Sequence, residues 1–106
     1  MTKTARVVVP RLLADTHLNH GQGVTPVVVH GDLWSGNKGR GRIGAMGPVE
    51  EVVFDPSACY AHSEYELGIM RMFGGFGVAF WREYHGICPK TEPVAEYEDR
   101  VALYEL

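Results

Sequence analysis

The segment that most constrains the fold is a run of three valines, Val27–Val29, which stands between a glycine-bearing turn and the polar stretch HGDLWSGN. β-branched side chains favour extended backbone, and a short apolar run between turn signals is typical of a buried strand. A second such run, VEEVVF at residues 49–54, follows the segment KGRGRIGAMGP, which holds four glycines. The pattern predicts two strands that flank a long polar excursion, with residues 38–48 as a flexible loop.

Elsewhere apolar residues recur at helical spacing, so most of the remaining chain is predicted to be helical. The expected helices cover residues 4–18 with a break or kink near Pro10, residues 63–73, residues 76–84 with an end near Gly86, and residues 94–106. Ser63 and Glu66 have the spacing of a capping box, in which each side chain satisfies a free backbone N–H at the start of a helix. The predicted fold class is α+β, mainly helical with a short two-stranded β element.

Several further side chains are expected to be structural. His62 is predicted to be a hydrogen-bonded structural histidine, and the cations Lys38, Arg40 and Arg42 are predicted to be solvated on their loop. An aromatic series is predicted to lie in the core: Phe73, Phe76, Phe80, Trp81 and Tyr84.

Length and charge limit the class of protein. The 106 residues allow one domain or part of one, and the net charge of −3 with scattered cations indicates neither a nucleic-acid footprint nor a polybasic membrane anchor. No apolar run approaches the roughly 20 residues of a membrane span. Cys59 and Cys88 lie outside any CxxC or zinc spacing, and no secretory leader is evident, which favours unpaired thiols in the cytoplasm. Small molecules or proteins are the expected partners.

Polar side chains with a spacing suited to phosphoryl transfer stand at the ends of the two apolar runs. His30, Asp32 and Asn37 follow the first run as H-x-D-x-x-x-x-N, and Asp55 comes directly after the second. Phosphoryl transfer from ATP needs a carboxylate beside the attacking hydroxyl, with an amide oxygen and a second carboxylate to hold Mg²⁺ on the phosphates. The alternative is purely structural, because H-G-D, S-G-N and D-P are all common in turns.

Longer blocks of the sequence carry a resemblance to a known family. HGDLWSGN at residues 30–37 resembles the catalytic loop of the aminoglycoside phosphotransferase branch of the protein-kinase-like superfamily. FDPSACYAHSEYELGIMRMFGGF at residues 54–76 and YHGICPK at residues 84–90 are similar to the fructosamine/ketosamine 3-kinases, which include the protein-ribulosamine 3-kinases. The resemblance covers roughly residues 6–106.

The resemblance implies roles for individual residues. Asp32 matches the catalytic aspartate, which would orient and deprotonate a sugar hydroxyl, and Asn37 and Asp55 match the Mg²⁺ ligands. Trp34 would bind substrate at the mouth of the sugar site, where an aromatic face stacks on a sugar ring; the alternative is a loop anchor.

The resemblance also implies a fold and a place in it. Residues 1–106 would form part of a kinase C-terminal lobe, with the catalytic loop at residues 30–37 and the metal loop at residues 54–57. His30 is expected to order the catalytic loop by hydrogen bonds, and Glu66 to give it structural support. The N-terminal ATP lobe and the final helices of the family are expected to be absent from this chain.

The implied reaction is the ATP-dependent phosphorylation of the sugar O3 of a ketosamine on a protein amine, which leads to deglycation. ATP and Mg²⁺ are the implied cofactors, and glycated protein amines or small ketosamines are the implied partners, with ribulosamine favoured over fructosamine. Asp32 and Asp55 would bring two negative charges to a nucleotide that is itself negative, so the chain alone is expected to bind ATP weakly and to be inactive. Two alternatives are another small-molecule kinase of the aminoglycoside phosphotransferase type and a non-catalytic kinase-lobe protein.

Overall fold

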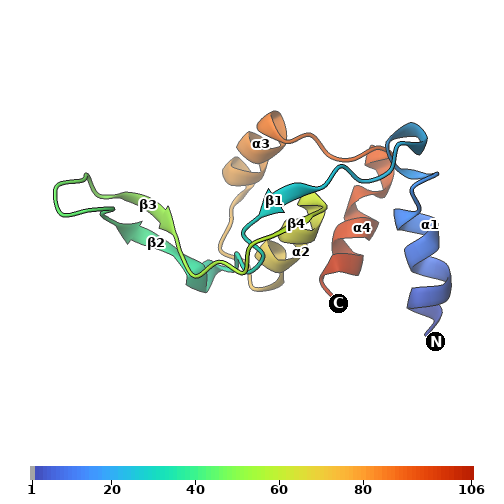
Figure 1. Cartoon of the computed structure of the whole chain (residues 1–106), viewed down its shortest axis with the longest axis horizontal. Coiled ribbons are helices and arrows are strands. Elements are labelled where there is room, and N and C mark those ends of the chain that lie inside the picture. The colour runs from blue at the N-terminus through green and yellow to red at the C-terminus, as the bar shows by residue number, and fades with distance from the viewer. Residues whose placement is uncertain (1) are drawn as a thin grey trace.

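The computed structural model describes residues 2–106 as four α-helices and two small antiparallel sheets, joined by short 3₁₀ and π-helical turns (Figure 1). The α-helices are α1 (Val9–Leu13), α2 (Ser63–Met72), α3 (Val78–Ile87) and α4 (Tyr97–Tyr104). The strands are β1 (Val27–Val29), β2 (Lys38–Gly41), β3 (Glu50–Val53) and β4 (Cys59–Ala61). The α+β class is therefore confirmed. Within residues 2–106 no helix combines the length and the apolar character that a membrane crossing requires.

The strands do not pair as the sequence predicted. Instead of one two-stranded element there are two, in which β1 pairs with β4 and β2 pairs with β3. The prediction of a flexible loop over residues 38–48 is wrong for its first part, which forms β2. Its glycine-rich sequence KGRG has low intrinsic strand preference, so the cross-strand partner in β3 supplies what local propensity does not. Arg40 and Glu51 are such partners, and their side chains form an exposed ion pair of 3.0 Å.

The core lies between α2 and α4. Leu67 and Met70 of α2 pack with Tyr97 and Val101 of α4, and all four side chains are buried. Close approach of the helices depends on Gly68, because a Cβ at this position would lie 2.8 Å from the Cβ of Tyr104. The short helix α1 lies alongside α4 at the same end of the molecule, while the β2–β3 hairpin projects from the opposite end (Figure 1).

Two helix ends differ from the prediction. The N-terminal helix of residues 4–18 is interrupted: a π-helical turn (Thr4–Val8) continues into α1, which ends at Leu13, and Leu18 lies in a separate 3₁₀ turn (Leu18–Gly21). The change from the π-helical turn to α1 falls next to Pro10, which lies in the first turn of α1, as expected of a proline at the start of a helical piece. The last helix is shorter than predicted, since a 3₁₀ turn (Val94–Glu96) precedes α4 and the helix ends at Tyr104.

The predicted capping box at the start of α2 is wrong. His62 is the N-cap residue, Ser63 is already helical, and no side chain caps the free N–H groups of this turn. Glu66 faces the loop after β1 instead of the backbone of its own helix. A carboxylate near the N-terminus of a helix remains favourable there because of the helix dipole.

The aromatic series is only partly in the core. Phe76, Trp81 and Tyr84 pack against the core from one side, but no residue of α3 is fully buried. Phe73 and Phe80 are exposed. The prediction failed because a helical apolar pattern does not indicate how completely its partner surface covers it.

Candidate active site

The β2–β3 hairpin joins the two polar segments that the sequence singled out. Lys38 pairs with Val53 at the base of the ladder, and the Phe54 N–H donates a hydrogen bond of 3.0 Å to the Asn37 carbonyl oxygen. Asn37 therefore lies opposite Phe54, and Asp55 is the next residue along the chain. The backbone of Asp55 is left-handed, with φ of +57°, which is uncommon for a residue other than glycine. Antiparallel pairing thus brings residues far apart in sequence to one end of the hairpin.

His30 ties the two segments together through its ring. The Nε2–H donates to the Phe54 carbonyl oxygen at 2.7 Å, and Nδ1 accepts a hydrogen bond from the Asp32 N–H at 3.3 Å. One ring nitrogen thus donates and the other accepts, so both ring nitrogens have a partner. The Ser57 N–H adds a third link by donating to the His30 carbonyl oxygen at 2.8 Å. His30 therefore links the loop at residues 30–37 to the segment at residues 54–57.

Gly31 allows this close approach. Its φ is +88°, and a Cβ on Gly31 would overlap the carbonyl oxygen of Ser57. Only glycine combines the left-handed backbone with the absence of a side chain at this contact. The glycine of the H-G-D triplet is therefore required by the packing of residues 54–57 against residues 30–37.

Glu66 holds the same loop from α2. Its Oε2 accepts the His30 N–H at 2.7 Å and its Oε1 accepts the Gly31 N–H at 3.0 Å, so one buried carboxylate binds two consecutive backbone amides. Charge-assisted hydrogen bonds of this kind are stronger than neutral ones. Structural support from Glu66 was predicted, but its capping-box spacing pointed to its own helix and not to these two amides.

Asp32 and Asn37 are in direct contact. The Asn37 side-chain Nδ2–H group donates to the Asp32 carbonyl oxygen at 2.9 Å and to the Asp32 carboxylate Oδ2 at 3.2 Å. Asn37 is buried and Asp32 half-buried. Both Nδ2 bonds fix the orientation of the amide, and its Oδ1 accepts no hydrogen bond from residues 2–106. That oxygen is therefore the atom of Asn37 left for a ligand.

Asp55 stands apart from this pair. It is exposed, and no hydrogen bond within residues 2–106 joins its carboxylate to Asp32 or Asn37. Over the same residues no three histidine, cysteine, aspartate or glutamate side chains converge as a metal-binding group. An amide oxygen with one or two carboxylates nevertheless fits Mg²⁺, which takes few protein ligands and keeps several waters.

Trp34 lies on the surface of the loop formed by residues 30–37 and is 38% exposed. A Cβ on Gly36 would fall on three neighbouring atoms of the indole six-membered ring at nearly equal distances, so one face of the ring rests on Gly36. Phe73 meets the indole in a tilted, edge-on contact with ring centroids 5.6 Å apart, and is itself 66% exposed. Trp34 is thus anchored on one side and open on another, so the structure contains elements of both sequence-based interpretations.

A cavity of about 660 Å³ lies beside the Glu66 carboxylate. Its walls include apolar side chains of β1, α2 and α3, among them Val29, Met70 and Phe80. Burial raises the pKa of Tyr84 in this wall to about 12, with smaller contributions from Cys88 and Glu66.

The two cysteines, Cys59 and Cys88, are unpaired as predicted, and both are exposed.

The predicted loop cations differ from one another. Lys38 is half-buried in β2, and its Nζ lies 5.1 Å from the ring centroid of Phe76, a cation–π distance. Arg40 is exposed and paired with Glu51, and Arg42 is exposed. The prediction of a solvated cation is therefore wrong for Lys38.

Comparison with known proteins defines the class to which this fold and site belong. The family model described as fructosamine kinase matches residues 2–106. The chain therefore belongs to the fructosamine kinase family.

Individual relatives agree with this result. Ketosamine-3-kinase of Mus musculus is 45% identical over 83 residues, which are 78% of this chain and 24% of the mouse protein. A probable ketoamine kinase of Synechocystis is 43% identical over 100 residues, which are 94% of this chain and 30% of that protein. The chloroplastic protein-ribulosamine 3-kinase of Oryza sativa subsp. indica is 37% identical over 95 residues, which are 89% of this chain and 26% of the rice protein. The matched residues span between 24% and 30% of the length of these relatives.

Proposed function

We propose that this chain is the part of a kinase C-terminal lobe that supplies the catalytic loop and the metal loop for ATP-dependent phosphorylation of ketosamines. The observation that carries the proposal is the linkage of residues 30–37 to residues 54–57 by the hydrogen bonds of His30 and Phe54. This linkage holds three groups near the base of the β2–β3 hairpin: the half-buried carboxylate of Asp32, the amide oxygen of Asn37 and the exposed carboxylate of Asp55. Family membership and the names of the relatives supply the reaction class.

Asp32 is the proposed general base. Its carboxylate accepts the proton of the sugar 3-hydroxyl while O3 forms a bond to the γ-phosphorus of ATP, and the bond from that phosphorus to the β–γ bridging oxygen breaks. The contact with Asn37 Nδ2 fixes the Asp32 carboxylate, so that its other oxygen is available to the substrate hydroxyl. A positioned base contributes about 10²- to 10⁴-fold to such a transfer.

Asn37 and Asp55 are the proposed protein ligands of Mg²⁺. The donor set fits the ion, and bound Mg²⁺ would neutralise charge on the transferred phosphoryl group. Fixing Asn37 Nδ2 on Asp32 directs its Oδ1 away from that residue. Asp55, which has a left-handed backbone, comes directly after the Phe54 carbonyl group to which His30 donates.

Trp34 is the proposed contact for the sugar. Its anchored indole lies two residues from Asp32 and has exposed surface on which the C–H face of a sugar can stack. Ribulosamine is the favoured substrate over fructosamine, with glycated protein amines or small ketosamines as partners. The 3-phosphate formed from such a substrate eliminates and frees the amine. The proposed location is the cytoplasm, although the rice relative is named as chloroplastic.

The test replaces the matching segment of mouse ketosamine-3-kinase with this chain, and the resulting chimera is called the exchanged enzyme. Its reaction with Mg-ATP and ribulosyl-lysine is followed by phosphorus NMR. The exchanged enzyme is expected to form the sugar 3-phosphate. Asp32→Asn is expected to lower kcat at least 100-fold with little change in KM, because it removes the base and retains the shape. Asp99→Asn, at an exposed position of α4, is the matched control and should retain full activity.

Two results would contradict the proposal. Full activity of Asp32→Asn would eliminate it as the base. Phosphorylation of choline or an aminoglycoside in preference to the ketosamine would replace the substrate class.

The same assay on the 106-residue chain alone is expected to leave ATP intact. Asp32 and Asp55 repel the phosphates, and no cation of residues 2–106 forms an ion pair with either carboxylate.

A further inference from the structure

A buried ion pair fixes the first turn of α2 on the side away from the catalytic loop. The Arg100 Nε–H donates to Glu64 Oε2 at 2.7 Å and its Nη2 donates to Glu64 Oε1 at 3.1 Å. Arg100 is fully buried and Glu64 is 1% exposed. A two-pronged contact of this kind holds a carboxylate in both position and orientation.

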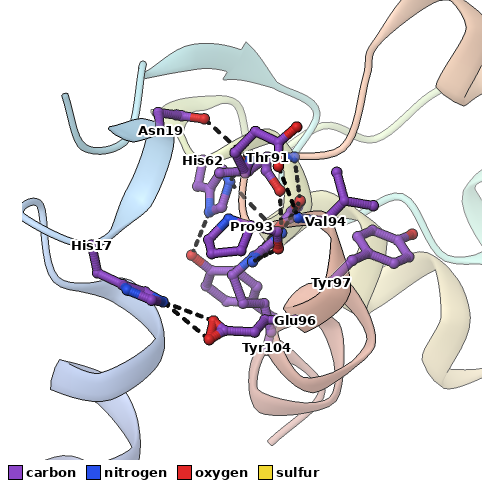
Figure 2. A network of polar contacts seen from close by, with 12 residues as sticks. His17, Asn19, His62, Thr91, Pro93, Val94, Glu96, Tyr97 and Tyr104 are labelled. Atoms are coloured by element: carbon purple, nitrogen blue, oxygen red, sulfur yellow. Dashed lines mark hydrogen bonds and ion pairs between the residues drawn. The ribbon is translucent and has the colours of Figure 1, made fainter. Parts of the chain in front are cut away.

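The same guanidinium holds the chain segment that passes over this turn. Arg100 Nη1 donates to the Pro93 carbonyl oxygen at 2.8 Å and Nη2 donates to the Thr91 carbonyl oxygen at 2.6 Å, while the Thr91 N–H donates to Glu64 Oε1 at 2.9 Å. Around it, His62 contacts the Tyr104 hydroxyl and the Thr91 hydroxyl, each at 2.8 Å (Figure 2). Every buried side-chain nitrogen and oxygen within residues 2–106 has a partner.

Glu64 and Glu66 connect this network to the candidate active site. They are two residues apart in the first turn of α2, so their side chains leave the helix about 200° apart. Glu64 faces Arg100 of α4, whereas Glu66 faces the His30 and Gly31 amides. One helical turn is therefore held from two nearly opposite sides.

The chemistry of the pair indicates a role in placement rather than in net stability. Two charges removed from water lose hydration that their attraction barely restores, and apolar pairs of similar volume are often equally stable or more so. An apolar pair, however, cannot fix a helical turn to within a fraction of an ångström as the three directed hydrogen bonds to the Glu64 carboxylate do. A displacement of Glu66 of this size would be passed directly to the two amides that it binds.

We propose that Arg100 is a positioning residue for the catalytic loop, which acts through Glu64 on the first turn of α2 and so on the Glu66 carboxylate. The structural coupling is independent of the reaction, but its catalytic consequence rests on the function proposed above. Arg100 touches no proposed substrate or metal ligand. It sets the position of Asp32 through the backbone that Glu66 holds.

The coupling is tested on the full 106-residue chain by amide hydrogen exchange resolved by NMR. Arg100→Lys retains a positive charge but lacks the planar fork that binds Glu64 and two carbonyl groups. We expect the His30 and Gly31 amides to exchange at least 10-fold faster, relative to the amides of the β2–β3 ladder. These amides keep their acceptor Glu66 in the variant, so a selective change reports a shift of that residue.

Glu98→Gln is the matched control. Glu98 forms an ion pair of 2.8 Å with Arg71, which also links α4 to α2 but is exposed. Its loss should leave the His30 and Gly31 amides unchanged relative to the ladder. Unchanged protection in Arg100→Lys, or an equal loss at all amides, would overturn the proposal.

A second variant covers the case in which Arg100→Lys does not fold. The double substitution Glu64→Met with Arg100→Met removes both charges, and buried ion pairs replaced in this way often retain stability. Its fold is checked by the exchange of the core amides around Leu67 and Val101. Selective loss of protection at His30 and Gly31 in this variant would support the proposal, and full protection there would overturn it.

An activity measurement separates this proposal from the proposed function. In the exchanged mouse enzyme, Arg100→Lys is expected to lower kcat at least 5-fold while KM for Mg-ATP stays within 2-fold, because the base is displaced and the nucleotide contacts are not. If the mouse enzyme that carries this chain had no ketosamine kinase activity, only the proposed function would be contradicted. The amide hydrogen-exchange experiment uses no substrate, so its result on Arg100 would still stand.

Discussion

Gly31 is subject to a constraint that arises from the neighbouring loop and not from its own segment of chain. Its left-handed backbone places the position of a Cβ on the Ser57 carbonyl group. His30, Asp32 and Asn37 could be selected from the sequence because their spacing matches a reaction that needs them. The contact between Gly31 and Ser57 could not, because it depends on where a segment 26 residues further along the chain lies.

Gly31→Ala is expected to destabilise the chain more than Gly44→Ala. Both glycines have positive φ, so alanine costs about 1–2 kcal/mol at either position. Gly44 faces open space, whereas at Gly31 the methyl group meets Ser57, which adds about 1–3 kcal/mol of overpacking. Urea denaturation of the two variants measures the difference, and equal losses would show that the two loops are not in contact.

His62 is expected to make the chain less stable in mild acid. Burial lowers its pKa below 6.5, and Arg100 acts in the same direction while Glu64 opposes it. The unfolded chain therefore takes up the proton first, so stability is complete above about pH 6.5 and is lost as the pH falls below it. His62→Gln should flatten the fall in the free energy of unfolding between pH 7 and pH 5. His20→Asn, at an exposed site, is the control, and an equal effect of both would contradict the assignment.

Helix–helix packing shows what sequence periodicity predicts at the level of an element. The pattern located α2, α3 and α4 because each has one apolar face, and it failed for β2 because that strand depends on its partner. The pattern also does not distinguish a glycine that permits contact from one that merely weakens a helix. Gly68 permits the contact with Tyr104, whereas Gly86 has nothing within 4 Å and only weakens its helix.

Alanine at these two glycines is expected to have effects of opposite sign. Alanine favours a helix over glycine by about 1 kcal/mol, so Gly86→Ala in α3, with nothing within 4 Å, should stabilise the chain by up to that amount. At Gly68 the new Cβ lies 2.9 Å from the Tyr104 carbonyl carbon, so Gly68→Ala should destabilise by forcing α2 and α4 apart. Thermal denaturation decides the sign, and stabilisation by Gly68→Ala would contradict the packing.

At the scale of the whole molecule, the candidate active site lies beside the core of an elongated shape, because Leu33 of the 30–37 loop packs against that core. The principal extents are 51, 29 and 24 Å, with α1 and α4 at one end, the β2–β3 hairpin at the other and α2 between them (Figure 1). The sequence predicted the α+β class and the family, because both depend on ordered blocks of residues. It could not predict that two small sheets replace one, since strand order depends on contacts between distant segments.

Buried tyrosines are expected to make the whole chain sensitive to alkali. Burial raises the pKa of Tyr84 and of Tyr104 to about 12, above the ordinary value of about 10. The unfolded chain loses these protons first, so their stabilising contribution is complete below pH 10 and is lost as the pH rises through 12. Tyr84→Phe should flatten the loss of stability between pH 10 and pH 12. Tyr60→Phe, at a position 78% exposed, is the control, and identical profiles for the two variants would contradict the burial effect.

The β2–β3 hairpin separates the pairing at its base, which places Asn37 and Asp55, from its far turn, whose length can change. Its root carries the Lys38–Val53 pair and the bond from Phe54 to Asn37, whereas its far turn projects from the body of the molecule (Figure 1). Residues inserted or deleted in that turn lengthen or shorten the hairpin without altering the register at its root. The number of residues between Asn37 and Asp55 can therefore change without altering the pairing that sets where these two residues lie.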